Sequence, residues 1–168
     1  MDLVRSLPAD LLDMYGMTQV ELAAALNVTQ TSISRWVRGD RSPSGEASAA
    51  IKRAIAAQDT PERSVDVGLR RGPVTIPDSL WAPAFRPTGR YRLPLRVEWS
   101  GSDQARWRDA SKRSVVLDGF VQVLVEGSAA DIAVWVDPVL LASACDEIVW
   151  PRAYQAPWKE SLSMWKLL

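Results

Sequence analysis

The stretch MTQVELAAALNVTQTSISRWVRG, residues 17–39, decides how this chain begins to fold. Thr18 and Glu21 have the spacing of a capping box, in which a hydroxyl and a carboxylate each satisfy a free backbone N–H at a helix start. Alanine and leucine, both strong helix formers, dominate the residues that follow. The pattern therefore predicts a helix over residues 19–26.

A second helix is predicted over residues 30–38. Thr29 is a suitable N-cap for it, and Gly39 is a natural C-terminal stop. Asn27 tolerates the left-handed backbone conformation that a tight turn between two helices demands. The stretch is thus expected to form two short helices that a three-residue turn joins.

The two predicted helices have an inner and an outer face. The apolar side chains whose spacing buries them together are Leu22, Leu26, Val28, Ile33 and Val37. The side chains that the same geometry turns outward are Gln30, Thr31, Ser34, Arg35 and Arg38. These outward groups donate and accept hydrogen bonds, and none is acidic. Such a helix can enter the major groove of DNA, where each base pair presents a distinct donor and acceptor pattern.

The motif resembles the helix-turn-helix of the lambda-repressor-like family, of the Xre/Cro type. The likeness lies in T-Q-x-E-L-A at the start, Q-x-x-I-S-x-W in the second helix and the closing Gly39. A short proline-containing loop, residues 41–44, follows that glycine, as is usual in the family. The resemblance covers roughly residues 7–57 and implies a bundle of four or five short helices. Asn27 departs from the family's frequent glycine at the turn.

The resemblance also implies roles for individual residues. The implied DNA-binding set is Gln19, Thr29, Gln30, Thr31, Ser32, Ser34, Arg35, Arg38 and Arg41. Within it, Gln30 and Thr31 correspond to the main base-reading positions, and Gln19 to a phosphate contact. Arg38 and Arg41 are expected at the DNA backbone. The alternative is a helical hairpin that binds protein and has lost DNA binding. Trp36 could pack beneath the helix or touch the sugar-phosphate backbone, and packing is favoured.

The rest of the chain predicts a mainly α protein with two parts. Residues 1–58 would form the DNA-binding domain, with Ser6 capping a first helix over 8–15 and a last helix over 45–58. Prolines should keep residues 59–90 free of regular elements, as a linker that becomes an extended arm. Residues 91–168 carry most of the tryptophans and would form a small, mostly helical domain with an extended arm or short strands.

Within residues 91–168, alternating apolar residues predict a strand over 91–99. Helices are expected over 115–125, 138–148 and 157–168. Ser128 to Asp131 has the pattern of another helix cap with an acidic first turn.

The net charge is zero, with 20 basic and 20 acidic residues, but the charges are unevenly spread. Residues 59–113 hold eleven basic and seven acidic side chains, whereas residues 114–168 hold three and seven. The arginines of the middle region could follow DNA phosphates. The favoured interpretation is a solvated surface that also pairs with the acidic last third. Likewise, Trp107 between Arg106 and Arg108 is expected to be a core residue with snorkelling neighbours.

Composition excludes several function classes. The chain has no histidine, which rules out histidine-based catalysis and histidine-ligated zinc. Its single cysteine, Cys145, permits no intrachain disulfide and is expected to be a plain buried thiol. The conspicuous carboxylates, at Asp131, Asp137, Asp146 and Glu147, show no converging pair. We therefore expect neither an enzyme nor a cofactor or metal. With no apolar span or signal peptide in the sequence, we expect no membrane association and a cytoplasmic location.

The sequence as a whole predicts a sequence-specific transcriptional regulator, a repressor that binds double-stranded DNA as a homodimer. The alternative is an antitoxin that neutralises a toxin through its C-terminal domain and represses its own operon. Residues 93–101, with parts of the later chain, resemble uncharacterised actinobacterial proteins, some encoded near nucleotidyltransferase-type toxin genes. That likeness, and an acidic last third suited to a basic partner, keep the alternative open.

Overall fold

The computed structural model describes residues 7–168, and in this range the protein is mainly helical. Its helices are α1 (Leu7–Tyr15), α2 (Gln19–Ala25), α3 (Gln30–Arg38), α4 (Gly45–Ala56), η1 (Ala57–Asp59, a 3₁₀ turn), α5 (Arg113–Glu126), α6 (Ala129–Trp135), α7 (Pro138–Ser143) and α8 (Gln155–Met164). Its short strands are β1 (Glu62–Val65), β2 (Val74–Pro77), β3 (Arg90–Tyr91) and β4 (Arg108–Asp109). The expected mainly α fold, a helix-turn-helix region followed by a small helical part, is confirmed. Ser6, the expected cap of the first helix, lies outside the described residues.

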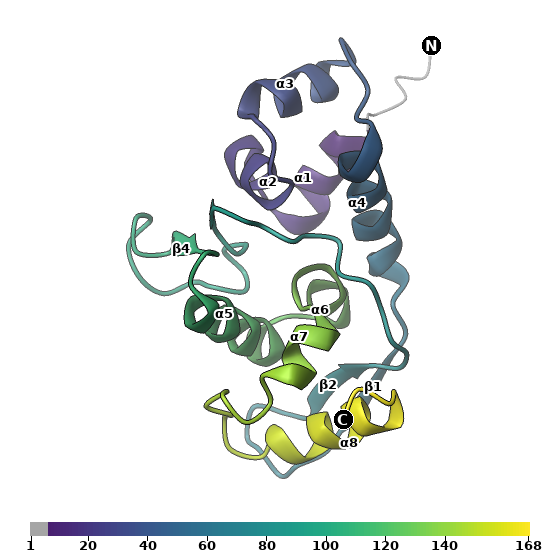
Figure 1. The fold of residues 1–168 in the computed structure, drawn as a ribbon, viewed down its shortest axis with the longest axis vertical. Helices are drawn as coiled ribbons and strands as arrows, with labels where there is room; N and C mark the ends of the chain where they lie inside the picture. The colour runs from purple at the N-terminus through teal and green to yellow at the C-terminus, as the bar shows by residue number, and fades with distance from the viewer. Residues whose placement is uncertain (1–6) are drawn as a thin grey trace.

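The molecule is elongated, with α3 at one end and α8 at the other (Figure 1). Helix α4 leads from the N-terminal helices toward the β1–β2 pair. From β2 the chain returns as an extended arm, residues 78–89, which ends beside α2 (Figure 1). The C-terminal helices fill the space below. Because the arm doubles back, residues of the C-terminal part reach the helix-turn-helix.

Helix α1 supports the N-terminal helices through its buried side chains Leu11 and Tyr15. The Tyr15 hydroxyl donates a hydrogen bond to the Ala54 carbonyl of α4 at 2.7 Å, which ties the first helix to the fourth. Met14 lies on the other face and is exposed. The first three helices and α4 thus pack against one another around shared buried side chains.

The proline-rich segment 59–90 is more regular than expected. β1 and β2 pair in an antiparallel hairpin, with Glu62 opposite Pro77 and Val65 opposite Val74. The prediction that prolines exclude regular elements here is wrong, because Pro61 precedes the first strand and Pro77 ends the second. The arm, residues 78–89, lies against the C-terminal part (Figure 1). Its Phe85 N–H donates to the Val134 carbonyl at 2.9 Å.

The strand expected over residues 91–99 is also wrong. β3 ends at Tyr91, and Pro94 begins a turn whose carbonyl accepts N–H bonds from both Val97 and Glu98. Leu93 and Val97 are buried, but Leu95 and Trp99, which share their phase in the alternation, are exposed, so burial does not follow the pattern of a strand.

The C-terminal helices form where they were expected, with two differences in length. Ser128 and Asp131 make a capping box at the start of α6, as predicted. Helix α7 ends at Ser143 rather than near residue 148, and the helix expected from residue 157 begins at Gln155 and ends at Met164. No helix within residues 7–168 is long and apolar enough to span a bilayer.

Tryptophans form much of the C-terminal core. Trp81, from the arm, packs edge-on against Trp158 and Trp165 of the C-terminal end. Trp99 is the exception, with 67% of its surface exposed. Cys145 is a buried thiol, as expected, and burial raises its pKa.

Two arginines join the N-terminal helices to the later chain. Arg92 pairs with the buried Glu21 of α2, where Nη2 lies 2.5 Å from Oε1. Arg96 pairs with the buried Asp131 of α6 and donates to the Tyr15 carbonyl at 2.5 Å. One continuous hydrophobic core runs through both parts. The helix-turn-helix is therefore held in a fixed place on the C-terminal part.

Candidate DNA-binding surface

Helix α3 begins and ends on the residues that the sequence indicated. The Thr29 hydroxyl accepts a hydrogen bond from the Ser32 N–H at 3.2 Å and lies 3.0 Å from the Ser32 hydroxyl. At the other end Gly39 adopts a left-handed conformation, with φ of 80°, and the next N–H returns to the Arg35 carbonyl. Caps at both termini fix α3 at nine residues.

The turn before α3 depends on Asn27, whose φ is 55°. Its amide Nδ2 donates to the Arg86 carbonyl at 2.9 Å. Its Oδ1 accepts hydrogen bonds from the Thr88 N–H and hydroxyl, at 2.8 and 2.9 Å. The departure from the family's glycine thus creates a clamp between the turn and the arm, which sequence reasoning missed.

Helix α2 carries the capping box that its sequence predicts. The Thr18 hydroxyl accepts from the Glu21 N–H at 3.2 Å, and Glu21 Oε2 accepts from the Thr18 N–H at 2.6 Å. Glu21 has a second role, since its other oxygen meets Arg92. Gln19, the expected phosphate contact, is half-buried in the first turn of α2.

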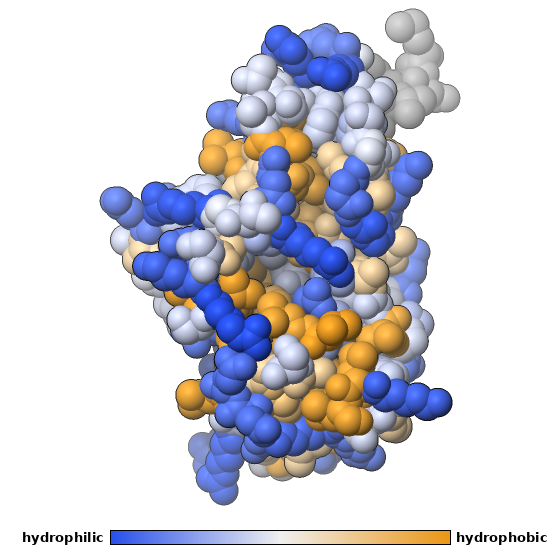
Figure 2. Space-filling model, in the orientation of Figure 1, coloured by the Kyte–Doolittle hydropathy of each residue, from blue (hydrophilic) through white to orange (hydrophobic). Residues whose placement is uncertain are grey.

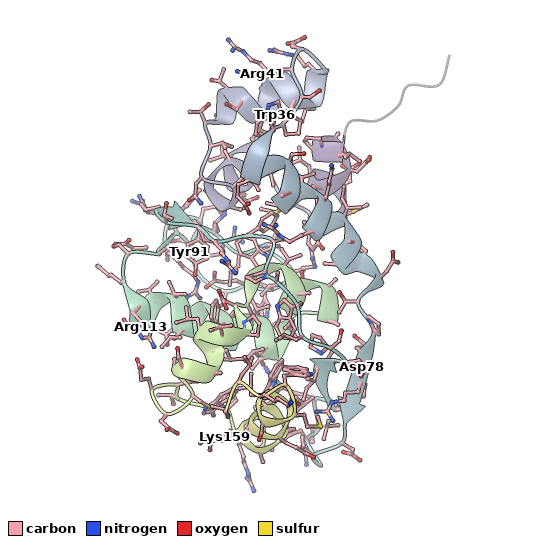
Figure 3. All side chains as sticks on the ribbon, turned by 45° about the vertical axis from the view of Figure 1, so that its right-hand side comes forward. Trp36, Arg41, Asp78, Tyr91, Arg113 and Lys159 are labelled. Carbon is pink, nitrogen blue, oxygen red and sulfur yellow. The ribbon has the colours of Figure 1, made fainter. Side chains whose placement is uncertain are left out.

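The two faces of α3 separate cleanly. Ile33 and Trp36 are buried against the other helices, so the favoured packing role of Trp36 is confirmed. The predicted site residues that are exposed are Thr29, Gln30, Thr31, Arg35, Arg38 and Arg41. Ser32 and Ser34 are half-buried. The polar residues lie at the α3 end of the molecule, where Figure 2 shows a hydrophilic surface and Figure 3 places Arg41 at the tip.

The electrostatics of this end are basic. Arg38 Nε lies 3.0 Å from the Asp40 carboxylate, and both side chains are more than half exposed. Within residues 7–168, Arg35 and Arg41 form no ion pair. Arg35 and Arg41 therefore present full positive charges to solvent, and Arg38 beside them is only weakly paired with Asp40. This arrangement suits binding of phosphate oxygens.

Some arginines of residues 59–113 pair with the acidic last third, as the favoured interpretation predicted, whereas Arg92 and Arg108 are largely buried and pair with Glu21 and Glu98. Arg71, Arg86 and Arg113 pair with Glu126, Asp137 and Glu147 of the acidic last third, at 3.0, 3.5 and 2.9 Å. Asp146 and Glu147 are exposed, in agreement with the predicted solvated face. These pairs neutralise part of the positive charge of residues 59–113.

The Arg106–Trp107–Arg108 segment reverses its expected roles. Arg106 is buried, with only 4% exposed, whereas Trp107 is half-buried at the surface. The guanidinium groups of Arg90 and Arg92 lie over the Trp107 ring, 5.9 and 5.5 Å from its centroid. The prediction of a core tryptophan with snorkelling arginines is wrong, because Trp107 is held by cation–π contacts instead.

The comparisons with known proteins agree with this geometry. A helix-turn-helix family model matches residues 9–55, less than a third of the chain. No curated protein and no solved structure matches. The matched residues include all of α2 and α3, together with the exposed arginines Arg35, Arg38 and Arg41, and α4 up to residue 55.

Fold and match together define the class of this part of the chain: it is a helix-turn-helix domain of the lambda-repressor, or Xre, type. The match supports a DNA-binding transcription regulator of that type.

Proposed function

We propose that the protein is a sequence-specific transcriptional repressor that reads DNA with α3. The observation that carries the proposal is the separation of faces on this helix, apolar residues buried and polar residues exposed at the end of the molecule. A protein-binding hairpin would have no need of an acid-free polar face that carries Arg35 and Arg41, which form no ion pair among residues 7–168. A cytoplasmic location follows from this role.

The residues divide by the contact they would make. Gln30 and Thr31, exposed in the first turn of α3, would meet base edges, and glutamine can bond bidentately to adenine. Arg35, one turn further along, would reach a base or sugar. Arg38 and Arg41, toward the far end, would meet phosphates and set the position of the helix. Gln19, Thr29, Ser32 and Ser34 complete the proposed set, near phosphate or sugar.

A single short helix makes too few base contacts for high specificity, so we propose a homodimer. Two copies would place their α3 helices in successive major grooves, about 34 Å apart. In this proposal residues 1–58 read DNA, residues 59–90 are the arm, and residues 91–168 carry the dimer contact. Light scattering of the purified protein measures the oligomeric state directly, and a monomer on and off DNA would contradict the dimer.

Selection of bound sites from random DNA tests the reading function. We expect an enriched sequence with two related half-sites, and no enrichment would overturn the proposal. Arg35→Ala should then weaken binding to the selected site, whereas Lys52→Ala, an exposed cation on α4, should not. A reporter placed behind the selected site tests the regulatory sign. Expression should fall when the protein is present, and a rise would indicate an activator.

The antitoxin alternative has one observation in its favour. Exposed apolar side chains lie in the acidic last third, among them Val139, Val149 and Met164, with Val149 89% exposed. An acidic surface with exposed apolar groups suits a basic protein partner. Co-expression with the product of the neighbouring gene separates the alternatives. A stable complex that relieves the partner's toxicity would favour the antitoxin, and a self-sufficient dimer would exclude it.

A further inference from the structure

A cavity of about 240 Å³ lies between the arm and helices α5, α6 and α7. Its wall is mainly apolar and includes four aromatic side chains, Phe85, Tyr91, Phe120 and Trp135. A cavity of roughly 150 Å³ is enough to hold benzene when its lining is apolar. The volume here therefore suits a flat molecule of one or two rings.

Two polar groups on this wall lack partners. The buried Trp135 indole N–H has no hydrogen-bond acceptor among residues 7–168. The Tyr91 hydroxyl also forms no hydrogen bond with any described residue, but unlike the Trp135 nitrogen its oxygen is not fully enclosed. Burial raises the pKa of Tyr91 to about 12, so the hydroxyl keeps its proton at neutral pH. The unpaired buried Trp135 N–H is costly, and a ligand acceptor would satisfy it.

Gly119 on α5 makes room for the Tyr91 hydroxyl. A Cβ atom at position 119 would lie 2.7 Å from that oxygen, too close for any side chain. Because residue 119 has no side chain, the Tyr91 hydroxyl has room to lie at the cavity wall. A larger residue at position 119 would fill this space.

The Asn27 clamp is attached to the same stretch of the arm that forms part of the cavity wall. Arg86 and Pro87 line the cavity, and the Arg86 carbonyl accepts the Asn27 amide hydrogen bond. Thr88, the next residue, donates both of its hydrogen bonds to the same amide. Arg86 is weakly tethered to Asp137 at the cavity, with 3.5 Å between the charged atoms. A molecule that moves this stretch of the arm acts directly on the turn between α2 and α3.

We propose that the cavity binds a small uncharged planar aromatic molecule that carries a hydrogen-bond acceptor, and that its binding changes DNA affinity through the Asn27 clamp. The apolar wall takes the rings, and Tyr91 and Trp135 supply the donors. The second half of this statement rests on the proposed DNA-binding function, whereas the first half does not.

Binding is tested with coumarin, a two-ring molecule with a carbonyl acceptor, and with naphthalene, which has none. Calorimetry and ligand-detected NMR measure both. Val116→Phe on α5 should fill the cavity and abolish coumarin binding. Val121→Phe, on the same helix but outside the cavity, is the matched control and should bind as before. Tyr91→Phe should weaken coumarin roughly five- to tenfold and leave naphthalene unchanged. Absence of coumarin binding up to millimolar concentration, or equal binding by Val116→Phe, would overturn the site.

The coupling is tested on DNA selected by the full chain. Coumarin should change the Kd for this DNA in the natural protein but not in Asn27→Gly, in which glycine keeps the left-handed turn and the clamp is lost. Coumarin binding itself should persist in that variant. Coumarin that binds without changing the DNA Kd would overturn the coupling. A protein that selects no DNA but binds coumarin would instead refute the proposed function and leave the cavity proposal standing.

Discussion

Replacing Arg92 with alanine would remove the only cation that faces Glu21 within the described chain. Arg92 Nε and Nη2 lie 2.6 and 2.5 Å from the same Glu21 oxygen, and the two side chains are 13% and 5% exposed. Removing one partner of a buried ion pair costs about 3–5 kcal/mol, because the remaining charge stays desolvated. Glu21 keeps its hydrogen bond from the Thr18 N–H, so we expect a loss near the lower limit, about 3 kcal/mol.

Urea unfolding followed by tryptophan fluorescence measures this loss. With a denaturant slope of about 2 kcal/mol per M, the midpoint should fall by about 1.5 M. Arg38→Ala is the matched control, because the Arg38–Asp40 pair also joins an arginine Nε to a carboxylate, at 3.0 Å, but is more than half exposed. Its loss should stay below about 1 kcal/mol.

A second substitution isolates the cause. Glu21→Gln removes the charge yet keeps a side chain that can complete a capping box. If the cost of Arg92→Ala comes from an unpaired buried carboxylate, the double variant R92A/E21Q should regain about 1–2 kcal/mol over R92A. A double variant no more stable than R92A would refute this reasoning and assign the loss to the cation–π contact with Trp107.

Three further predictions concern the DNA-binding face and the buried tyrosines. Gln30→Ala should weaken binding to the selected DNA by about 1–3 kcal/mol and spare random DNA, whereas Arg41→Ala should weaken both and lower the salt slope by about 1 in salt-dependent titrations. Equal effects of the two variants on random DNA would contradict the assigned roles. Thr29→Ala should cost about 1 kcal/mol in thermal unfolding through loss of the α3 cap, and Thr29→Ser should restore it. Burial raises the pKa of Tyr15 and Tyr91 to about 12, so the folded state favours the neutral phenol and stability should be full below pH 10 and fall toward pH 12. Tyr91→Phe should reduce that alkaline loss in urea unfolding at pH 8 and 11, and an unchanged loss would argue against a raised pKa at Tyr91.

Local signals in the sequence were accurate wherever the interaction spans a few residues. The caps at Thr18, Thr29 and Ser128 and the left-handed turn at Asn27 all formed as predicted. Each rests on a hydrogen bond or a backbone preference within three residues, which neighbouring sequence alone decides. The helix-turn-helix could be recognised for this reason.

The errors arose where burial depends on distant contacts. The alternation around Leu93 and Val97 resembled a strand, but a turn begins at Pro94 and both side chains are buried in the core that distant segments form. Arg106 is buried, whereas Trp107 lies nearer the surface, where Arg90 and Arg92 of an earlier segment cover its ring. A charge pattern cannot indicate which arginine enters the interior.

The sequence by itself determined the helix-turn-helix: two capped helices, the turn between them and a polar, acid-free face on α3. Only the tertiary structure decided how the helix-turn-helix is attached to the rest of the protein. Asn27 meets Thr88 and Glu21 meets Arg92 across 61 and 71 residues of chain, and the cavity forms from segments that meet only after folding. The physical reason is the number of residues along the chain that separates the interacting groups. Caps and turns are satisfied within one helical turn, whereas a buried ion pair, a clamp or a cavity requires the whole chain to bring its parts together.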